Sequence, residues 1–221
     1  MSPTIILAQT LSTSIVLIAS GGIASLSLFD LPILQSQPAS RSLPSTRWLF
    51  SRGSHIFPPA SLTSALGFLY LSFLSLGPSR SLGQALRIMK NGGSPKVYGY
   101  LAAAILSFSI GPFTQLAMIP TNFQLIEMNE KKGGKRSARS ALESDQGGKM
   151  RERKAIDSVN GEGEGAESTD LSGPQERTEV KTTKEDDARA RTLLKRFETL
   201  NAVRAGLIGA GGIVGLVTAL L

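Results

Sequence analysis

The placement of charge is the feature that most restricts how this chain can fold. No Asp, Glu, Lys or Arg occurs in 1–29, 53–79, 97–126 or 205–221. An α-helix needs roughly 20 apolar residues to cross a hydrocarbon core of about 30 Å. The first three stretches exceed this length. The last one reaches it when Arg204 joins its first turn, because a long basic side chain can extend to the membrane surface. The pattern therefore predicts four transmembrane helices.

We predict an all-α membrane protein in which residues 1–221 form a single domain, a four-transmembrane-helix bundle. The predicted spans cover about residues 5–29, 56–76, 97–119 and 201–221. Pro58 and Pro59 fall in the first turn of the second span, where a missing N–H is tolerated. Pro112 falls inside the third span and is expected to kink it.

The first span also allows a second interpretation. Its apolar run resembles the core of a signal peptide, with Gly22, Ile23 and Ala24 as a small-residue cleavage site. No Lys or Arg precedes the run, and it continues to Phe29. These two observations favour a retained span over a cleaved one.

Small residues recur four positions apart in the spans, a spacing that allows helices to approach closely in lipid. The pairs are Gly21 and Ser25, Gly99 and Ala103, Ser107 and Gly111, Ala205 and Gly209, and Gly211 and Gly215. Gly and Ala are common in all membrane helices, so a single pair carries little weight. The whole set predicts one tight bundle.

Residues 130–190 have a different composition. They are rich in Gly, Ser, Glu, Lys and Arg and contain no aromatic residue. Such a segment cannot bury enough apolar surface to offset its chain entropy, so we predict a long disordered loop between the third and fourth spans. Acidic residues are interleaved with the basic ones, which argues against nucleic acid as a partner. Protein partners that bind this loop remain open.

The chain has few residues that could bind a metal or a cofactor. It has no cysteine and one histidine, His55. The carboxylates nearest the predicted spans are Asp30, Glu127 and Glu198, whereas a transition-metal site usually needs three or more ligands. The Gly-rich run 161–167 follows no strand and is no dinucleotide fingerprint. We therefore expect neither a metal nor a cofactor.

Four spans place both chain ends on one side of the membrane and the connections 30–55 and 120–200 on the other. Polar residues gather at the helix boundaries on this shared side, and polar groups at membrane depth usually face the bundle interior and mark function. They are Trp48, Arg52, His55, Thr121, Asn122, Asn201 and Arg204, and Thr114 lies about two turns deeper in the third span. The alternative is that these residues are interfacial anchors and helix caps.

The distribution of Lys and Arg predicts the orientation. The shared side has three in 30–55, five in 120–140 and five in 185–204, against four in 77–96 on the other side. The positive-inside rule then places the shared side in the cytosol. We expect a multi-pass protein of an endomembrane, such as the endoplasmic reticulum or a vesicle.

Four segments resemble the anthrone oxygenase-like family of fungal integral membrane proteins. They are "LPIL" (31–34), "RWLFSRGSHIFPPAS" (47–61), "GPFTQLAMIPTNFQL" (111–125) and "FETLNAVRAG" (197–206). Together they touch all four spans in the family's order. The pair Pro-Phe-Thr and Pro-Thr-Asn is the most specific part, followed by Asn-x-x-Arg.

The resemblance implies a function. Members of this family are expected to convert a flat tricyclic methylene, an anthrone made as a polyketide in secondary metabolism, to a quinone with O2 and without metal or flavin. This reaction needs an oxyanion donor and a base. We predict Arg52 or Arg204 for the first role, and for the second His55, the one side chain in the sequence that is ordinarily a base near neutral pH. Trp48, Thr114, Thr121, Asn122 and Asn201 would bind the substrate or position the arginines. The partners expected are thus an aromatic substrate, O2 and the lipid bilayer.

A second function stays open at this point. A non-catalytic four-span scaffold or assembly protein would use its long polar loop to bind partners. Ion or proton transport is disfavoured, because few ionisable residues lie within the spans.

Overall fold

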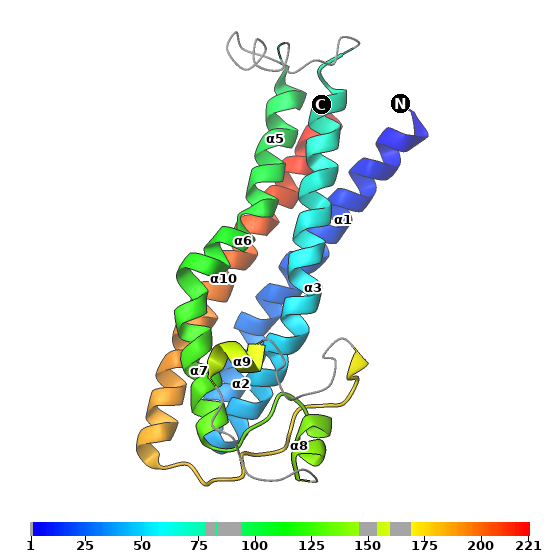
Figure 1. The fold of residues 1–221 in the computed structure, drawn as a ribbon. Helices are drawn as coiled ribbons and strands as arrows, with labels where there is room; N and C mark the ends of the chain where they lie inside the picture. Colours follow the sequence, from blue (N-terminus) through cyan, green and yellow to red (C-terminus); the bar gives the residue numbers. More distant parts are fainter. Residues whose placement is uncertain (1, 78–82, 84–93, 146–153, 160–168) are drawn as a thin grey trace. The chain divides into compact units, whose positions relative to one another are not determined.

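The computed structural model describes residues 2–77, 83, 94–145, 154–159 and 169–221, and every regular element within them is helical. Figure 1 shows their order along the chain. The elements are α1 (Pro3–Ser25), η1 (Leu26–Asp30), α2 (Leu31–Gln35), α3 (Ala39–Leu74), α5 (Pro95–Phe108), α6 (Ile110–Phe113), η2 (Thr114–Met118), α7 (Ile119–Lys131), α8 (Ala138–Asp145), α9 (Ala155–Val159) and α10 (Lys184–Leu220). The labels η1 and η2 mark π-helical turns.

Four helical runs among the described residues are long and apolar enough to cross a membrane. They are Pro3–Gln35, Ala39–Leu74, Pro95–Lys131 and Lys184–Leu220. The all-α class and the number of spans predicted from the gaps in charge are confirmed. The lengths differ from the prediction, because each run continues as helix past its apolar stretch.

The second span shows the largest difference. Its helix α3 begins at Ala39, whereas the sequence predicted a start near residue 56. Pro58 and Pro59 therefore lie inside a helix, and their placement in its first turn was wrong. Each proline removes one N–H, which leaves the carbonyls of Ser54 and His55 without their usual intrahelical donor.

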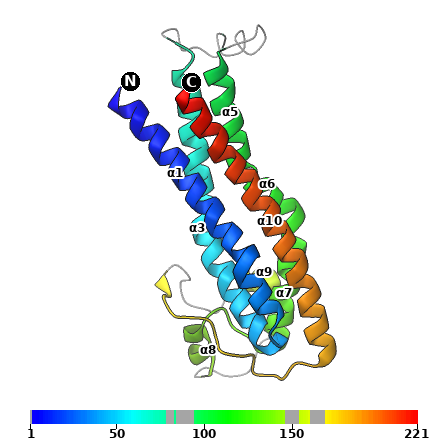
Figure 2. The same cartoon turned by 180° about the vertical axis from the view of Figure 1, so that it is seen from behind.

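The chain divides into two compact units. Unit 1 consists of Met1–Ala24, Phe57–Phe113 and Ala202–Leu221, and unit 2 of Ser25–Ile56 and Thr114–Asn201. Parts of α1, α3 and α10 belong to unit 1, together with α5 and α6. Figures 1 and 2 show the course of these helices from two sides.

The core of unit 1 is apolar with a few hydrogen bonds between helices. Val16, Ile23, Phe68 and Ile208 are completely buried, and the ring of Phe68 stacks on Tyr100 at a centroid distance of 6.4 Å. Serine hydroxyls join the helices by donating to main-chain carbonyls. These bonds run from Ser20 to Ala205 (2.9 Å), from Ser61 to Ser107 (2.5 Å) and from Ser72 to Val97 (2.9 Å).

Several glycines of unit 1 allow this packing. A Cβ added at Gly215 would lie 2.3 Å from the Phe68 ring, and one at Gly211 would lie 3.0 Å from the main-chain nitrogen of Ser107. A Cβ at Gly99 would lie 2.1 Å from the hydroxyl of Thr218. By contrast, Gly21 and Gly111 have nothing within 4 Å of such a Cβ. The small-residue pattern therefore predicted some close contacts correctly, but not all of them.

In unit 2, the start of α10 contacts the segments η1, α2 and α3. The rings of Phe50 and Phe197 meet edge to face at 4.9 Å, and the Ser27 hydroxyl donates to the main-chain carbonyl of Glu198 at 3.1 Å. Both π-helical turns belong to this unit, and each is followed two residues later by a proline, Pro32 or Pro120. π-Turns occur frequently at functional sites.

α7 ends in a glycine cap. Gly133 has φ of +75°, and the N–H groups of Gly133 and Gly134 donate to the carbonyls of Glu130 (3.0 Å) and Asn129 (2.9 Å). This is the Schellman arrangement, which favours glycine because a left-handed residue is required. It turns the chain from α7 into the segment that was predicted to be a disordered loop.

Parts of the segment 130–190 are ordered, so the prediction of disorder was too broad. The N–H of Val180 donates to the carbonyl of Lys132 (3.0 Å), and that of Thr178 donates to Ser40 (2.8 Å). Lys132 also forms an ion pair with Asp186 at 2.5 Å. Residues 146–153 and 160–168 of the predicted loop lie outside the described residues. The composition argument failed for the remainder because hydrogen bonds and an ion pair, not apolar burial, attach it.

Candidate functional site

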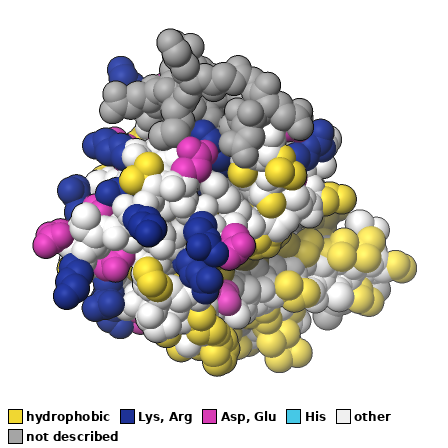
Figure 3. Space-filling model, turned by 90° about the horizontal axis from the view of Figure 1, so that it is seen from below, with side chains coloured by type: hydrophobic (Ala, Val, Ile, Leu, Met, Phe, Trp, Pro, Cys, Tyr) yellow, Lys and Arg dark blue, Asp and Glu magenta, His cyan; other side chains and the backbone are white. Residues whose placement is uncertain are grey.

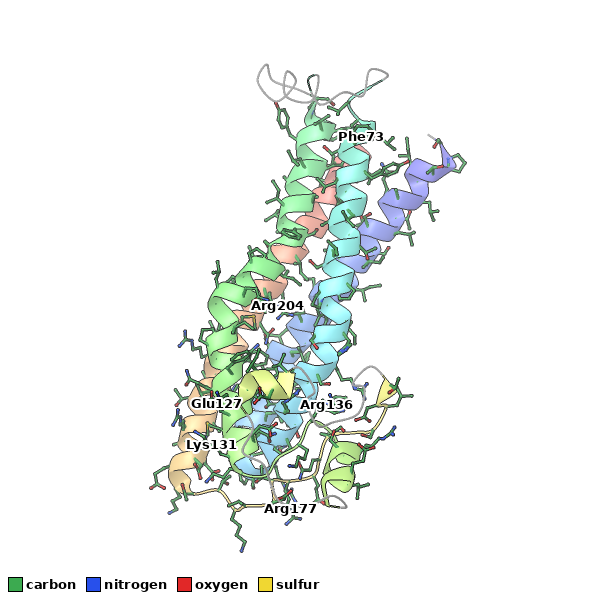
Figure 4. All side chains as sticks on the ribbon, viewed as in Figure 1. Phe73, Glu127, Lys131, Arg136, Arg177 and Arg204 are labelled. Carbon is green, nitrogen blue, oxygen red and sulfur yellow. The ribbon has the colours of Figure 1, made fainter. Side chains whose placement is uncertain are left out.

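Arg204 lies in unit 1 on α10 and is labelled in Figure 4. Its side chain is only 9% exposed, and its guanidinium carbon lies 5.7 Å from the centroid of the Phe57 ring. Phe57 in turn packs against the hydrophobic core. A cation on the face of an aromatic ring is stabilised, most strongly where water is excluded. The arrangement places a positive charge and an aromatic surface side by side next to an apolar core.

A glycine makes room for this aromatic ring. A Cβ added at Gly22 of α1 would lie 3.2 Å from the ring of Phe57. The sequence analysis named Arg204 but missed Phe57. The sequence could have indicated Phe57, because this residue precedes Pro58 and Pro59 within a segment that resembles the family.

Three predicted polar residues of unit 2 have buried side-chain atoms that form no hydrogen bond within the described part of the chain. Among the residues that the structure describes, the Thr121 hydroxyl, the Asn122 side-chain oxygen and both amide atoms of Asn201 have no partner. Thr121 and Asn201 have no exposed surface. A buried polar group left unsatisfied costs about 1–3 kcal/mol. Such groups in a native protein call for an explanation, and a polar ligand is one.

Asn129 shares this property and was missed by the sequence analysis. It lies two turns after Thr121 on α7, is completely buried, and has no partner for its amide among the described residues. Its amide lies next to Gly134 at the helix cap, where an added Cβ would be 1.9 Å from the amide oxygen. No family motif covers Asn129, so it serves below as a reference position.

Trp48 and Arg52 bind the ordered loop. The indole N–H of Trp48 donates to the main-chain carbonyl of Ser172 at 2.9 Å. The guanidinium of Arg52 donates to the carbonyls of Asp170 and Ser172 and stacks on the Trp48 ring at 5.4 Å. These two residues lie side by side, and the donors that were expected to meet a substrate are engaged with the protein's own main chain.

The segment that they hold is ordered by Asp170. This carboxylate accepts hydrogen bonds from the Ser137 hydroxyl and from the N–H (2.9 Å) and hydroxyl (2.7 Å) of Ser172. Burial alone would raise the pKa of Asp170, but these hydrogen bonds and the charge of Arg52 lower it below its usual value. The run Asp-Leu-Ser-Gly-Pro at 170–174 is typical of a turn, and it could have predicted this anchor.

His55 lies on α3 of unit 2 with its ring exposed. Its Nδ1 lies 2.8 Å from the main-chain oxygen of Ser51 and 3.3 Å from the Ser54 hydroxyl. Because a carbonyl only accepts, Nδ1 carries the proton in the first contact. The neutral ring then keeps its lone pair on Nε2, which is the nitrogen able to take a proton.

Thr114 is the first residue of η2 and is half-buried. Its hydroxyl lies 3.9 Å from the sulfur of Met118, which is a weak acceptor. Whether all eight predicted residues form one pocket stays a prediction. Among the described residues, no group of three or more His, Cys, Asp or Glu side chains could hold a metal ion.

The helices and their buried polar residues define a class of protein. Four apolar helices carry unpaired amide and hydroxyl groups in one unit and a buried arginine on an aromatic ring in the other. These are features of a multi-pass membrane protein with polar groups buried among its helices.

A comparison with known protein families identifies the family within this class. The model of the anthrone oxygenase family matches residues 47–214, which is more than half of the chain, and the chain belongs to this family. Membership indicates an oxygenase-type role. Neither the curated proteins nor the solved structures gave a match.

Proposed function

We propose that this protein is a membrane-bound oxygenase that converts anthrone-like polyketide phenolics to quinones with O2 and without a bound cofactor. One observation carries the proposal beyond family membership. Asn201 is completely buried, and both of its amide atoms lack a partner among the described residues. A substrate that carries phenol and ketone oxygens would supply the missing acceptor and donor.

The proposed reaction balances without a further reactant. A base removes one proton from the methylene carbon, and the carbanion delocalises its charge onto the ring ketone. The carbanion passes one electron to O2, and the resulting radical and superoxide combine to form a C–O bond. Loss of the second methylene proton then breaks the O–O bond. One oxygen atom of O2 becomes the new carbonyl, and the other leaves as water.

Arg204 is the better of the two candidates for stabilising the oxyanion. The guanidinium of Arg52 is occupied by the loop carbonyls, and its role in the proposal is to fix that loop. Arg204 has an aromatic neighbour, Phe57, whose face suits a flat substrate. A charge-assisted hydrogen bond in a dry site stabilises a developing oxyanion strongly.

The remaining residues have supporting roles in the proposal. Asn201 lies three residues before Arg204 on α10, so both project from one face of that helix. Asn201, Thr121 and Asn122 would orient the oxygens of the substrate. His55 would take the methylene proton at Nε2. Trp48 and Thr114 stay predicted contacts with the substrate.

The test compares stability and turnover in purified full-length protein. Asn201→Leu replaces a buried amide by an apolar group of similar size, so unfolding should be no easier than in the wild type, or harder. O2 consumption with a panel of anthrones should nevertheless fall at least tenfold. Arg204→Gln should lower turnover about a hundredfold, the usual effect of losing one oxyanion donor.

Asn129→Leu is the matched control. It also replaces a buried, unpartnered amide, but it lies outside the proposed site, so turnover should stay within about twofold of the wild type. Full turnover in Asn201→Leu would refute the role of the amide. Equal losses in both asparagine variants would show that the activity depends on general packing.

A scaffold remains the second candidate, and one exposed side chain favours it. Leu171 is 89% exposed although its neighbours Asp170 and Ser172 are held by Trp48 and Arg52. If the protein is a scaffold, this leucine, which lies outside the spans, would be one point of contact for a protein partner. Absence of O2 uptake with every anthrone, together with a partner whose binding is lost in Leu171→Ser, would favour this function.

A further inference from the structure

A groove in unit 2 lies apart from the residues proposed to bind the substrate. It has a volume of about 530 Å³ and is lined by the end of α2 and by one face of α10. The lining residues are Gln35, Arg191, Thr192, Lys195, Arg196 and Thr199. The five residues of α10 are spaced by one turn or by one residue, so they form a continuous strip along the helix.

The groove is positively charged. Three of its six lining residues are cations and none is an acid. Glu198 pairs with Lys195 at 2.7 Å and accepts from the Gln35 amide at 2.5 Å. Three positive charges against one negative charge leave a surplus of two. In Figure 3, which views the molecule from below, Lys and Arg side chains are spread over the face among Asp and Glu.

The two arginines differ in how they are held. Nε of Arg191 donates to the main-chain carbonyl of Gln35 at 3.1 Å, which fixes this arginine against the last residue of α2. Arg196 is exposed and forms no hydrogen bond or ion pair with any residue that the structure describes. Its planar guanidinium offers N–H donors in the geometry that matches two phosphate oxygens.

The two threonines of the strip line the groove but have no free donor for a phosphate, because each hydroxyl proton is already given to the helix. Thr192 and Thr199 donate to the carbonyls of Ala188 (3.0 Å) and Lys195 (3.1 Å) of their own helix. These bonds fix both side chains in one rotamer on the wall of the groove. The wall is therefore arranged before any ligand arrives, which lowers the entropic cost of binding.

The groove lies close to the start of the apolar part of α10. Lys195 and Arg196 precede Asn201 by six and five residues, which is about 8 Å along the helix at 1.5 Å per residue. The polar headgroup layer of a bilayer is roughly 5–8 Å thick on each side. Lys195 and Arg196 thus lie at the depth of lipid phosphates if the span begins at Asn201.

We propose that this groove binds a phosphate group. It can belong to the headgroup of an anionic phospholipid or to a soluble phosphorylated molecule, and the chemistry of recognition is the same. Arg196 would bind two phosphate oxygens, Arg191 and Lys195 would supply further charge, and the groove would fix α10 to the membrane surface in the lipid case.

The test uses the full-length protein with two kinds of phosphate. In one arm, nanodiscs of phosphatidylcholine with and without phosphatidic acid are compared by native mass spectrometry for lipid that stays bound. In the other arm, glycerol 3-phosphate is added in neutral detergent, and protection against thermal unfolding is measured. Arg196→Gln should weaken the binding of the preferred phosphate about fivefold or more.

Arg189→Gln is the control, since it removes the same charge from an exposed position of α10 outside the groove. Its affinity should stay within about twofold of the wild type. Arg196→Lys keeps the charge but loses the planar fork, so an intermediate loss is expected. Without ligand, all three variants should unfold at the wild-type temperature, because each side chain is exposed.

The two experiments distinguish a lipid phosphate from a soluble phosphate. Retention of phosphatidic acid that depends on Arg196 assigns the site to lipid, and protection by glycerol 3-phosphate with the same dependence assigns it to a soluble ligand. The proposal is overturned if neither arm shows binding, or if Arg189→Gln weakens binding as much as Arg196→Gln. The second result would mean unspecific attraction by charge.

Discussion

Gly215 gives the sharpest test of the packing in unit 1. A Cβ at this position would lie 2.3 Å from Cε1 and 2.5 Å from Cζ of Phe68, whereas ordinary contacts begin at 3.4 Å. The ring would have to move by about 1 Å, yet it is completely buried and stacked on Tyr100. Overpacking of this kind costs about 1–3 kcal/mol.

Helix propensity acts in the opposite direction. Replacing Gly by Ala in a helix gains up to about 1 kcal/mol. Gly215→Ala should therefore destabilise the protein by up to about 2 kcal/mol, which is the cost of overpacking less a propensity gain of about 1 kcal/mol. Gly206→Ala is the control on the same helix, because nothing lies within 4 Å of its added Cβ. That variant should be as stable as the wild type or up to about 1 kcal/mol more stable.

The assay is unfolding by sodium dodecyl sulfate in mixed micelles, followed by far-ultraviolet circular dichroism. A second mutation checks the cause. Phe68→Leu shortens the ring that the new methyl group meets, so it should cost less in the Gly215→Ala background than in the wild type, with a coupling of about 1 kcal/mol. Equal stability of Gly215→Ala and Gly206→Ala, or strictly additive effects with Phe68→Leu, would refute this account of the packing.

Three further predictions concern unit 2 and the orientation. Trp48→Phe removes the N–H that donates to Ser172, which should weaken the attachment of the loop by about 1 kcal/mol and speed its cleavage by a protease; unchanged cleavage would contradict the anchor. The pKa of Asp170 is lowered in the folded protein, so its contribution to stability is present above the unfolded pKa of about 3.9 and is lost as the pH falls through the folded value. Thermal unfolding measured against pH should therefore show a steeper acid loss in the wild type than in Asp170→Asn, and parallel curves would exclude this linkage. A glycosylation acceptor placed in 140–180 should stay unmodified in microsomes, and its efficient modification would reverse the predicted orientation.

Charge alone predicted the number of spans but not where the helices end. The prediction for the second span began near residue 56, where the apolar stretch begins, whereas α3 begins at Ala39. The additional turns are polar, and contacts distant in sequence, such as Phe50 with Phe197, stabilise them. The hydropathy of neighbouring residues contains no information about contacts between segments that are distant in the sequence.

In the candidate site, too, the sequence predicted local properties but not contacts between distant segments. Burial of Asn201 and Thr121 followed from their position at the ends of apolar stretches, and the structure buries both completely. The partners of Trp48 and Arg52 could not be predicted in this way. They depend on the path of Asp170–Ser172, a segment more than a hundred residues away whose composition indicated disorder.

The spacing of small residues was informative only in part. Gly211 and Gly215 each approach a neighbouring helix, as their separation by four suggested, while Gly21 and Gly111 do not. A separation of four establishes that two residues share a face of their helix. It does not establish whether that face meets another helix or lipid.

The way in which the loop is attached has a consequence for how this protein can evolve. Trp48 and Arg52 bind main-chain carbonyls, and the contacts of Thr178 with Ser40 and of Val180 with Lys132 also join main chain to main chain. Almost any residue can supply a carbonyl, so most positions of the segment can drift in sequence while its path over the helices is preserved. The exceptions are positions whose side chains form the bonds, such as Asp170, Gln175, Asp186 and Asp187. Relatives should therefore share the course of this loop long after their loop sequences have ceased to align.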